Sequence, residues 1–176
     1  MRHFWTIEVR LVVDTNVRVA AELASSKETS AAAQLLRLIQ RKVYERASGK
    51  AGEKRQRVVV VWLRSLEMQN ELREQLAKRG FRSSWVLSIL QETAMFSELV
   101  TVEERDISNL RKQAPLEAHD DLHVIACAIK GKATHIVTYD KRHLLTPEAK
   151  RFMRRYGIKV VTPAEMLDEL RRLGDP

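Results

Sequence analysis

The sequence predicts an α/β fold in which a mainly parallel sheet lies between two layers of helices. Short apolar runs that are rich in β-branched residues alternate with longer segments whose apolar side chains recur at helical spacing. The run Val58–Val61 consists of valine alone, which is typical of a strand buried on both faces of a parallel sheet. Strands that alternate with helices therefore predict a three-layer α/β/α sandwich.

In the first half of the chain, a strand is expected at 8–13, where the run Leu11–Val13 is apolar. A helix at 28–44 carries Leu35, Leu36 and Ile39 on one face. The valine strand follows. The remaining elements of this half are a helix at 63–78 that ends before Gly80, a helix at 85–93, and a short extended segment at 99–102.

In the second half, a helix at 103–111 ends before Pro115, because proline breaks helical hydrogen bonding. Another helix is expected from Asp121 to Ile129. Thr162 and Pro163 are a favourable start for the last helix. The other expected elements are a strand at 135–139, a helix at 147–156 that stops at Gly157, a strand at 158–161 and the closing helix at 164–173.

The length of 176 residues predicts a single domain over 1–176, with an exposed basic insertion near 46–57. The chain carries 31 lysine and arginine residues against 23 acidic residues, so its formal net charge is +8. A strongly basic balance favours a polyanionic partner such as RNA over the alternative that the charges merely keep the domain soluble.

The single cysteine, Cys127, lies in an apolar helical run and cannot form an internal disulfide. A buried structural thiol in a reducing cytoplasmic compartment is expected. Charged residues interrupt the first ten positions, so no signal peptide is expected there. No apolar run reaches the 18 residues of a membrane span, so no membrane association is expected.

Three aspartates and a glutamate stand where the ends of parallel strands should meet. Asp14 ends the first strand, Asp140 ends the strand at 135–139, Asp121 begins a helix, and Glu67 follows the valine strand. Ligands of open parallel sheets bind outside the carboxyl ends of the strands. At a separation of about 6 Å and an effective dielectric of about 20, each like-charged pair costs about 3 kcal/mol. Such a cluster requires raised pKa values or a bound cation, and oxygen ligands suit Mg²⁺ or Mn²⁺.

Four segments together resemble the PIN domain, a nuclease family that includes VapC-type toxins and ribosomal-RNA processing enzymes. The matching segments are residues 11–17, 121–128, 133–144 and 157–163. The resemblance covers about residues 9 to 172 and implies a three-layer fold and a metal-dependent endoribonuclease. It also implies two biological settings that the sequence does not separate, a toxin held by an antitoxin protein and an RNA-processing enzyme.

The resemblance assigns roles to individual residues. Asp14, Glu67, Asp121 and Asp140 match the acidic quartet that holds the metal, and Asn16 and Thr138 match polar residues that orient it. Glu71 lies one helical turn after Glu67 on the same face, and it is the alternative for the second acid. The family often has a further acid where this chain has Arg142, which leaves open whether one metal or two are bound.

Several surface assignments complete the prediction. RNA contacts are expected from Lys141, Arg142, Arg151, Arg154 and Arg155, whereas His119 and His123 beside Asp121 are expected to be incidental. His143 could also touch substrate phosphates. The apolar faces of the helices at 63–78 and 84–93 could form a homodimer. The alternative to an enzyme is a PIN-like module that binds RNA or protein without cutting.

Overall fold

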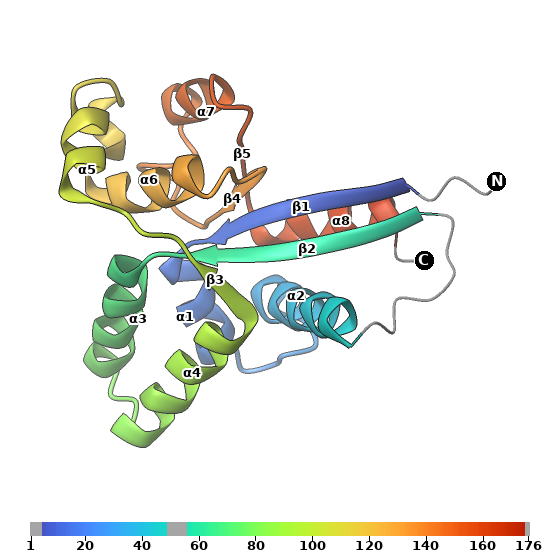
Figure 1. Ribbon diagram of the computed structural model, residues 1–176. Helices are drawn as coiled ribbons and strands as arrows, with labels where there is room; N and C mark the ends of the chain where they lie inside the picture. The colour runs from blue at the N-terminus through green and yellow to red at the C-terminus, as the bar shows by residue number, and fades with distance from the viewer. Residues whose placement is uncertain (1–4, 49–55, 175–176) are drawn as a thin grey trace.

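Five parallel strands form one sheet within the part of the chain that the structure describes, residues 5–48 and 56–174. The structure is a computed structural model, and its sheet has the strand order β3-β2-β1-β4-β5 (Figure 1). Every pair of neighbouring strands is parallel. Helices cover both faces of this sheet, which confirms the predicted three-layer α/β/α sandwich.

The strands differ greatly in length. β1 and β2 pair along residues 5–12 and 56–63 and extend together beyond the other three strands (Figure 1). The strands are β1 (Trp5–Val13), β2 (Gln56–Arg64), β3 (Ser97–Leu99), β4 (His135–Val137) and β5 (Lys159–Val161). The helices are α1 (Thr15–Leu23), α2 (Ala31–Ala47), α3 (Leu66–Lys78), α4 (Ser83–Phe96), α5 (Glu104–Arg111), the 3₁₀ helix η1 (Leu116–Asp121), α6 (Leu122–Lys130), α7 (Pro147–Arg154) and α8 (Pro163–Gly174).

Alternation along the two long strands divides the core between the two faces of the sheet. Val12, Val61 and Leu63 face a cluster formed mainly by α5, α6 and α7. Leu11 and Val60 face a second cluster formed by α1, α2 and α8. Because successive side chains of a strand point to opposite faces, the continuous valine run fills both clusters. The prediction that this strand is buried on both faces is thereby confirmed.

Helices α3 and α4 form a third cluster beyond the end of the sheet. Leu72, Leu76, Val86 and Ile89 are buried there against Val19 of α1. The apolar faces that were expected to support a homodimer are thus largely used inside the chain. Three large apolar side chains of α4 remain exposed: Trp85, Leu87 and Met95. A homodimer through this surface stays a prediction.

The connection between strands places a topological switch between β1 and β4. The chain runs from β1 to β2 and β3 on one side of the sheet, and then returns to β4 and β5 on the other side. The backbone N–H of Asp14 donates to the carbonyl of Val137 at 2.9 Å, so the carboxyl ends of β1 and β4 are joined directly. This edge of the sheet is where ligands of open α/β folds bind.

The helix α1 was not anticipated from the sequence. It begins directly after Asp14, and its first residues, Thr15, Asn16 and Val17, are weak helix formers. Packing outweighs this weak propensity, because Val17 and Ala21 are buried in the cluster of α1, α2 and α8. The first turn of the helix fixes the positions of Asn16 and Thr15 beside the end of β1.

Most of the expected basic insertion at 46–57 lies outside the described residues, since 49–55 are not described. Cys127 is buried and free, as expected, and burial raises the pKa of its thiol to about 12. Within the described residues, no helix has the length and apolar composition that crossing a bilayer requires.

Arg18 ties α1 to α4 and thereby stabilises the helix that carries part of the site. Its guanidinium is buried and pairs with Glu22 and Glu92. Replacing Arg18 by Met should lower the free energy of unfolding by about 2–3 kcal/mol, because it removes the buried partner of the Glu22 carboxylate, which is 12% exposed and retains only the more distant Lys27. Urea unfolding followed by circular dichroism measures this change.

The matched control is Arg105→Met, since Arg105 pairs with Glu103 in an ion pair whose side chains are 75% and 46% exposed. This variant should differ from wild type by less than about 0.5 kcal/mol. Equal effects of the two substitutions would contradict the assigned role of Arg18.

Candidate metal centre

Asp14 lies at the centre of the site, and two side chains orient it. It ends β1, serves as the N-cap position of α1, and is 3% exposed. Its Oδ2 accepts a hydrogen bond from Asn16 Nδ2 at 2.6 Å and another from Thr138 Oγ1 at 2.6 Å. Both donors favour the ionised carboxylate.

Thr138 and Asn16 also connect the loop after β4 to the start of α1. The backbone N–H of Asp140 donates to Thr138 Oγ1 at 2.9 Å, and that of Tyr139 donates to Asn16 Oδ1 at 3.1 Å. Thr138 is fully buried. The two side chains therefore help to set the position of Asp140 as well as that of Asp14. Their role in orienting metal ligands stays a prediction.

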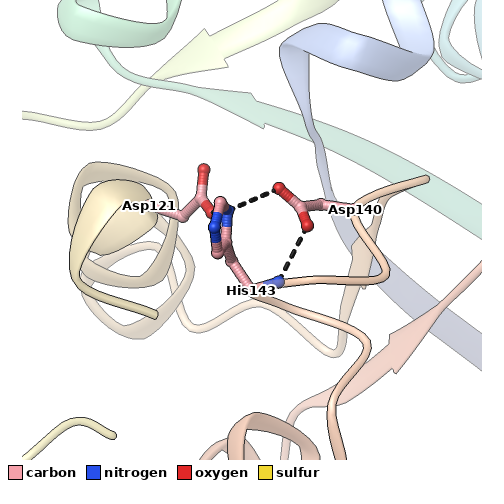
Figure 2. A group of neighbouring side chains, drawn as sticks. All are labelled: Asp121, Asp140 and His143. Atoms are coloured by element: carbon pink, nitrogen blue, oxygen red, sulfur yellow. Dashed lines mark hydrogen bonds and ion pairs between the residues drawn. The ribbon is translucent and has the colours of Figure 1, made fainter. Parts of the chain in front are cut away.

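Asp121 and Asp140 approach each other from different elements, and His143 lies between them (Figure 2). Asp121 is the last residue of η1 and the N-cap position of α6. Asp140 follows β4, and its Oδ1 accepts the backbone N–H groups of Arg142 and His143, each at 2.8 Å. His143 Nδ1 lies 2.9 Å from Asp140 Oδ2 and 3.3 Å from Asp121 Oδ2.

The structure places Glu71, rather than the preferred Glu67, beside the other acids. Glu71 Oε2 accepts a hydrogen bond from Thr15 Oγ1 at 2.9 Å and lies 3.1 Å from His123 Nε2. Glu67 is exposed and lines a neighbouring pocket of about 500 Å³ instead. Both glutamates lie on one helix face, but the later residue is the one that reaches the end of β1.

The acidic residues line one pocket of about 300 Å³. Its lining includes the four carboxylates of Asp14, Glu71, Asp121 and Asp140, and Asn16 lies among them. Three of the four expected acids are thus brought together, and Glu71 stands in the place that was given to Glu67. The lining of the pocket also includes Gln75 of α3 and Arg79, the residue that follows this helix.

Repulsion and burial make two of these carboxylates unusually weak acids. The pKa of Asp14 is raised to about 6, mainly by burial and also by the charges of Asp121 and Glu71, against the opposing hydrogen bond from Thr138. Burial also raises the pKa of Asp121 to about 6, with the charge of Asp140 acting in the same direction. Nearby histidines oppose this shift without cancelling it.

Glu71 and His123 form a pair in which the pKa of the glutamate is lowered and the pKa of the histidine is raised. Burial tends to raise the pKa of Glu71, but hydrogen bonds from His123 and Thr15 and the His123 charge lower it below its ordinary value. Burial tends to lower the pKa of His123, and Glu71 raises it above its ordinary value. The pair therefore favours an ionised glutamate, and His123 is a site residue that the sequence analysis regarded as incidental.

The donor set fits a divalent cation. Within the described residues, Asp121 Oδ2 is a buried oxygen without a hydrogen-bond partner. Such an atom is costly unless a cation or a donor satisfies it. Carboxylate oxygens are hard ligands that suit Mg²⁺ or Mn²⁺, and a cation would also relieve the repulsion that raises the pKa values of Asp14 and Asp121.

Comparison with known families is consistent with this geometry. The sequence model of the PIN domain matches residues 10–142, which is more than half of the chain. The chain belongs to the PIN domain family. The predicted resemblance to this family of nucleases is confirmed.

The remaining comparisons of this PIN domain were with solved structures and with curated proteins. A solved structure of VapBC-1 from nontypeable Haemophilus influenzae is similar to it, with 15% sequence identity and a TM-score of 0.45. The match covers 88% of this chain and 98% of the other. The search of curated proteins found no match.

The basic residues of this PIN domain that were expected to contact RNA lie in two regions. Lys141 and Arg142 are exposed on the loop that follows Asp140. Arg151, Arg154 and Arg155 are exposed on and just after α7 and do not line the acidic pocket. Their contact with RNA stays a prediction.

Arg79 of this PIN domain emerged from the geometry alone, whereas His143, expected only to touch substrate phosphates, contacts the acids themselves. His143 follows Asp140 by three residues, a spacing that lets its ring reach back to the carboxylate across the loop. Arg79 was not singled out, because it follows a helix and resembles an ordinary C-terminal cation. His119 lies 3.4 Å from a backbone carbonyl and outside the acidic pocket, as expected for an incidental residue.

The raised pKa of Asp14 predicts a pH-dependent effect of Asp14→Asn. Because folding raises this pKa from 3.8 to about 6, the metal-free protein loses stability as pH rises between these values. At pH 8 in EDTA, the variant should therefore be more stable than wild type by about 3 kcal/mol, and at pH 4 the difference should fall below about 1 kcal/mol. Urea unfolding at both pH values measures this.

Addition of Mg²⁺ or Mn²⁺ at pH 8 serves as the control, because it should stabilise wild type but not the variant. A variant that is no more stable than wild type in EDTA at pH 8 would show that the ionised carboxylate of Asp14 does not destabilise the metal-free protein.

Proposed function

We propose that this PIN domain is an endoribonuclease that depends on Mg²⁺ or Mn²⁺. The observation that carries the proposal is the gathering of four carboxylates in one pocket at the topological switch of the sheet. A structural ion pair or a helix cap explains each acid separately. Neither explains why two of the acids have raised pKa values and no lysine or arginine side chain neutralises them within the described residues.

The residues divide into ligands and groups that orient the ligands. Asp14, Asp121, Asp140 and Glu71 would hold the cation, and Asn16 and Thr138 would orient Asp14 through the hydrogen bonds described above. A divalent cation at this position supplies activation of water for attack on a phosphodiester and stabilisation of the leaving oxygen. His123 keeps Glu71 ionised and fixes its direction.

The charge distribution supports RNA as the substrate. The net charge of +8 is found on a chain whose candidate site is acidic, so basic residues must dominate the remaining surface. Arg79 lies on the rim of the pocket, and Lys141 and Arg142 are exposed beside it. We propose that these three contact phosphates near the scissile bond, and that Arg151, Arg154 and Arg155 of the α7 region contact the flanking strand.

Two biological settings are compatible with the same site. A toxin that an antitoxin protein holds inactive and an RNA-processing enzyme require the same acids and the same cation. Expression of the chain alone in cells separates the two, because a toxin arrests growth and a processing enzyme does not.

The direct test is Mn²⁺ binding and RNA cleavage by wild type and by Asp121→Asn. Wild type should bind Mn²⁺ in calorimetry and cleave RNA only when the metal is present. The variant should cleave at least about 100-fold more slowly. It loses a carboxylate that is proposed to hold the cation and whose Oδ2 has no hydrogen-bond partner. Gel analysis of defined RNA oligomers measures the rate.

Purified wild type that binds RNA but does not cleave it with either metal would instead support a binding module. The presence of Arg142 in place of the further acid gives that alternative its basis. Cleavage that survives unchanged in the variant would exclude the acidic pocket as the catalytic site.

Glu71 and Glu67 provide a second test that uses one substitution at two positions. Glu71→Gln should reduce metal-dependent cleavage at least about tenfold, because it weakens the cation site. Glu67→Gln should retain the wild-type rate within about twofold, because Glu67 is exposed and lies in the neighbouring pocket. The opposite ranking would restore Glu67 as the functional acid.

A further inference from the structure

His143 occupies a position that its hydrogen bonds alone do not explain. Its imidazole stands between the carboxylates of Asp121 and Asp140, and one ring nitrogen, Nδ1, faces both (Figure 2). Asp140 Oδ1 already accepts two backbone N–H groups, so the loop is closed without the ring. Asp121 Oδ2 lies 3.3 Å from Nδ1 and still has no hydrogen-bond partner.

The spacing of these three atoms matches neighbouring ligands around one ion. Metal–ligand distances of about 2.1 Å place adjacent ligand atoms of an octahedral shell about 3.0 Å apart, and those of a tetrahedral shell about 3.4 Å apart. Nδ1 lies 2.9 Å from Asp140 Oδ2 and 3.3 Å from Asp121 Oδ2. One ligand atom from each of the three residues lies within 4.8 Å of the other two.

The second ring nitrogen of His143 also has a partner of the appropriate kind. His143 Nε2 lies 4.0 Å from Asp120 Oδ2, at the limit of an ion pair. Histidines that bind metals commonly direct the other ring nitrogen toward a carboxylate, which places the proton there and frees the first nitrogen for the metal. In the metal-free protein, Nδ1 donates a hydrogen bond to Asp140 Oδ2 at 2.9 Å. Metal binding would move the proton to Nε2, on the side of the exposed Asp120, and leave the lone pair of Nδ1 for the metal.

We propose that His143 is a metal ligand through Nδ1, together with Asp121 and Asp140, and that this nitrogen makes the site selective for Mn²⁺ over Mg²⁺. The inference rests on the proposed metal-dependent function and adds the identity of a ligand and the class of cation. Imidazole suits transition metals, whereas Mg²⁺ favours oxygen ligands and water. A site with one nitrogen among its oxygens therefore gains affinity for Mn²⁺ and gives little advantage to Mg²⁺.

The experiment uses Mn²⁺ alone as the probe and reads the ligand atom directly. Pulsed electron paramagnetic resonance of Mn²⁺ bound to the full chain should show coupling to ¹⁴N. Protein labelled with [¹⁵N]histidine should show ¹⁵N coupling instead, which identifies the nitrogen as histidine without any substitution. The coupling should disappear in His143→Gln and persist in His123→Gln and in His119→Gln, the matched control outside the acidic pocket.

Affinity provides an independent readout. By calorimetry, His143→Gln should bind Mn²⁺ at least about tenfold more weakly than wild type, while its affinity for Mg²⁺ should change less. Asp121→Asn should weaken the binding of both Mn²⁺ and Mg²⁺.

The outcomes separate this inference from the proposed function. Mn²⁺ that binds wild type without nitrogen coupling, or with coupling that survives in His143→Gln, would overturn the ligand role of His143 and leave the carboxylate site standing. Wild type that binds neither metal would overturn both.

Discussion

Confinement of like charges at one edge of the sheet is the constraint on which this site depends. The chain order brings Asp14 to the end of β1 beside the loop after β4, and the backbone hydrogen bond from Asp14 to Val137 fixes that approach. Packing on both faces of the sheet supplies the free energy that holds the carboxylates together. Their repulsion is then available to favour a cation, because binding one removes a cost that the fold already carries.

The hydrogen bonds of the pocket distribute this charge unevenly. Asp14 receives two short side-chain hydrogen bonds, and one oxygen of Asp140 receives two backbone hydrogen bonds. Glu71 is held ionised by His123 and Thr15. Asp121 keeps an oxygen without a hydrogen-bond partner. The carboxylates are thus oriented by the protein while some of their capacity as ligands remains, which is what a preorganised cation site requires.

The acidic pocket and the basic chain serve compatible purposes. A surface with excess positive charge attracts polyanions, whereas an uncompensated acidic pocket would repel the phosphate of the proposed RNA substrate. A divalent cation bound among the carboxylates would reconcile the two, because it would offset part of their negative charge and give the phosphate a positive centre to contact. Arg79, the residue that follows α3, lines the pocket, and the exposed Lys141 and Arg142 follow Asp140 on the loop after β4.

The sequence by itself determined the α/β class, the strands and the acids at strand or helix ends, Asp14, Asp121 and Asp140. Local patterns are sufficient there, because apolar periodicity defines each element and parallel strands place their carboxyl ends at one edge. The tertiary structure decided α1, whose weak helix formers are held by packing, and the choice of Glu71 over Glu67. Residues one turn apart share a helix face but differ by about 6 Å along its axis, and the packing of α3 fixes which one reaches the site. The tertiary structure also decided that the ring of His143 lies beside Asp121, because the two residues belong to different segments of the chain.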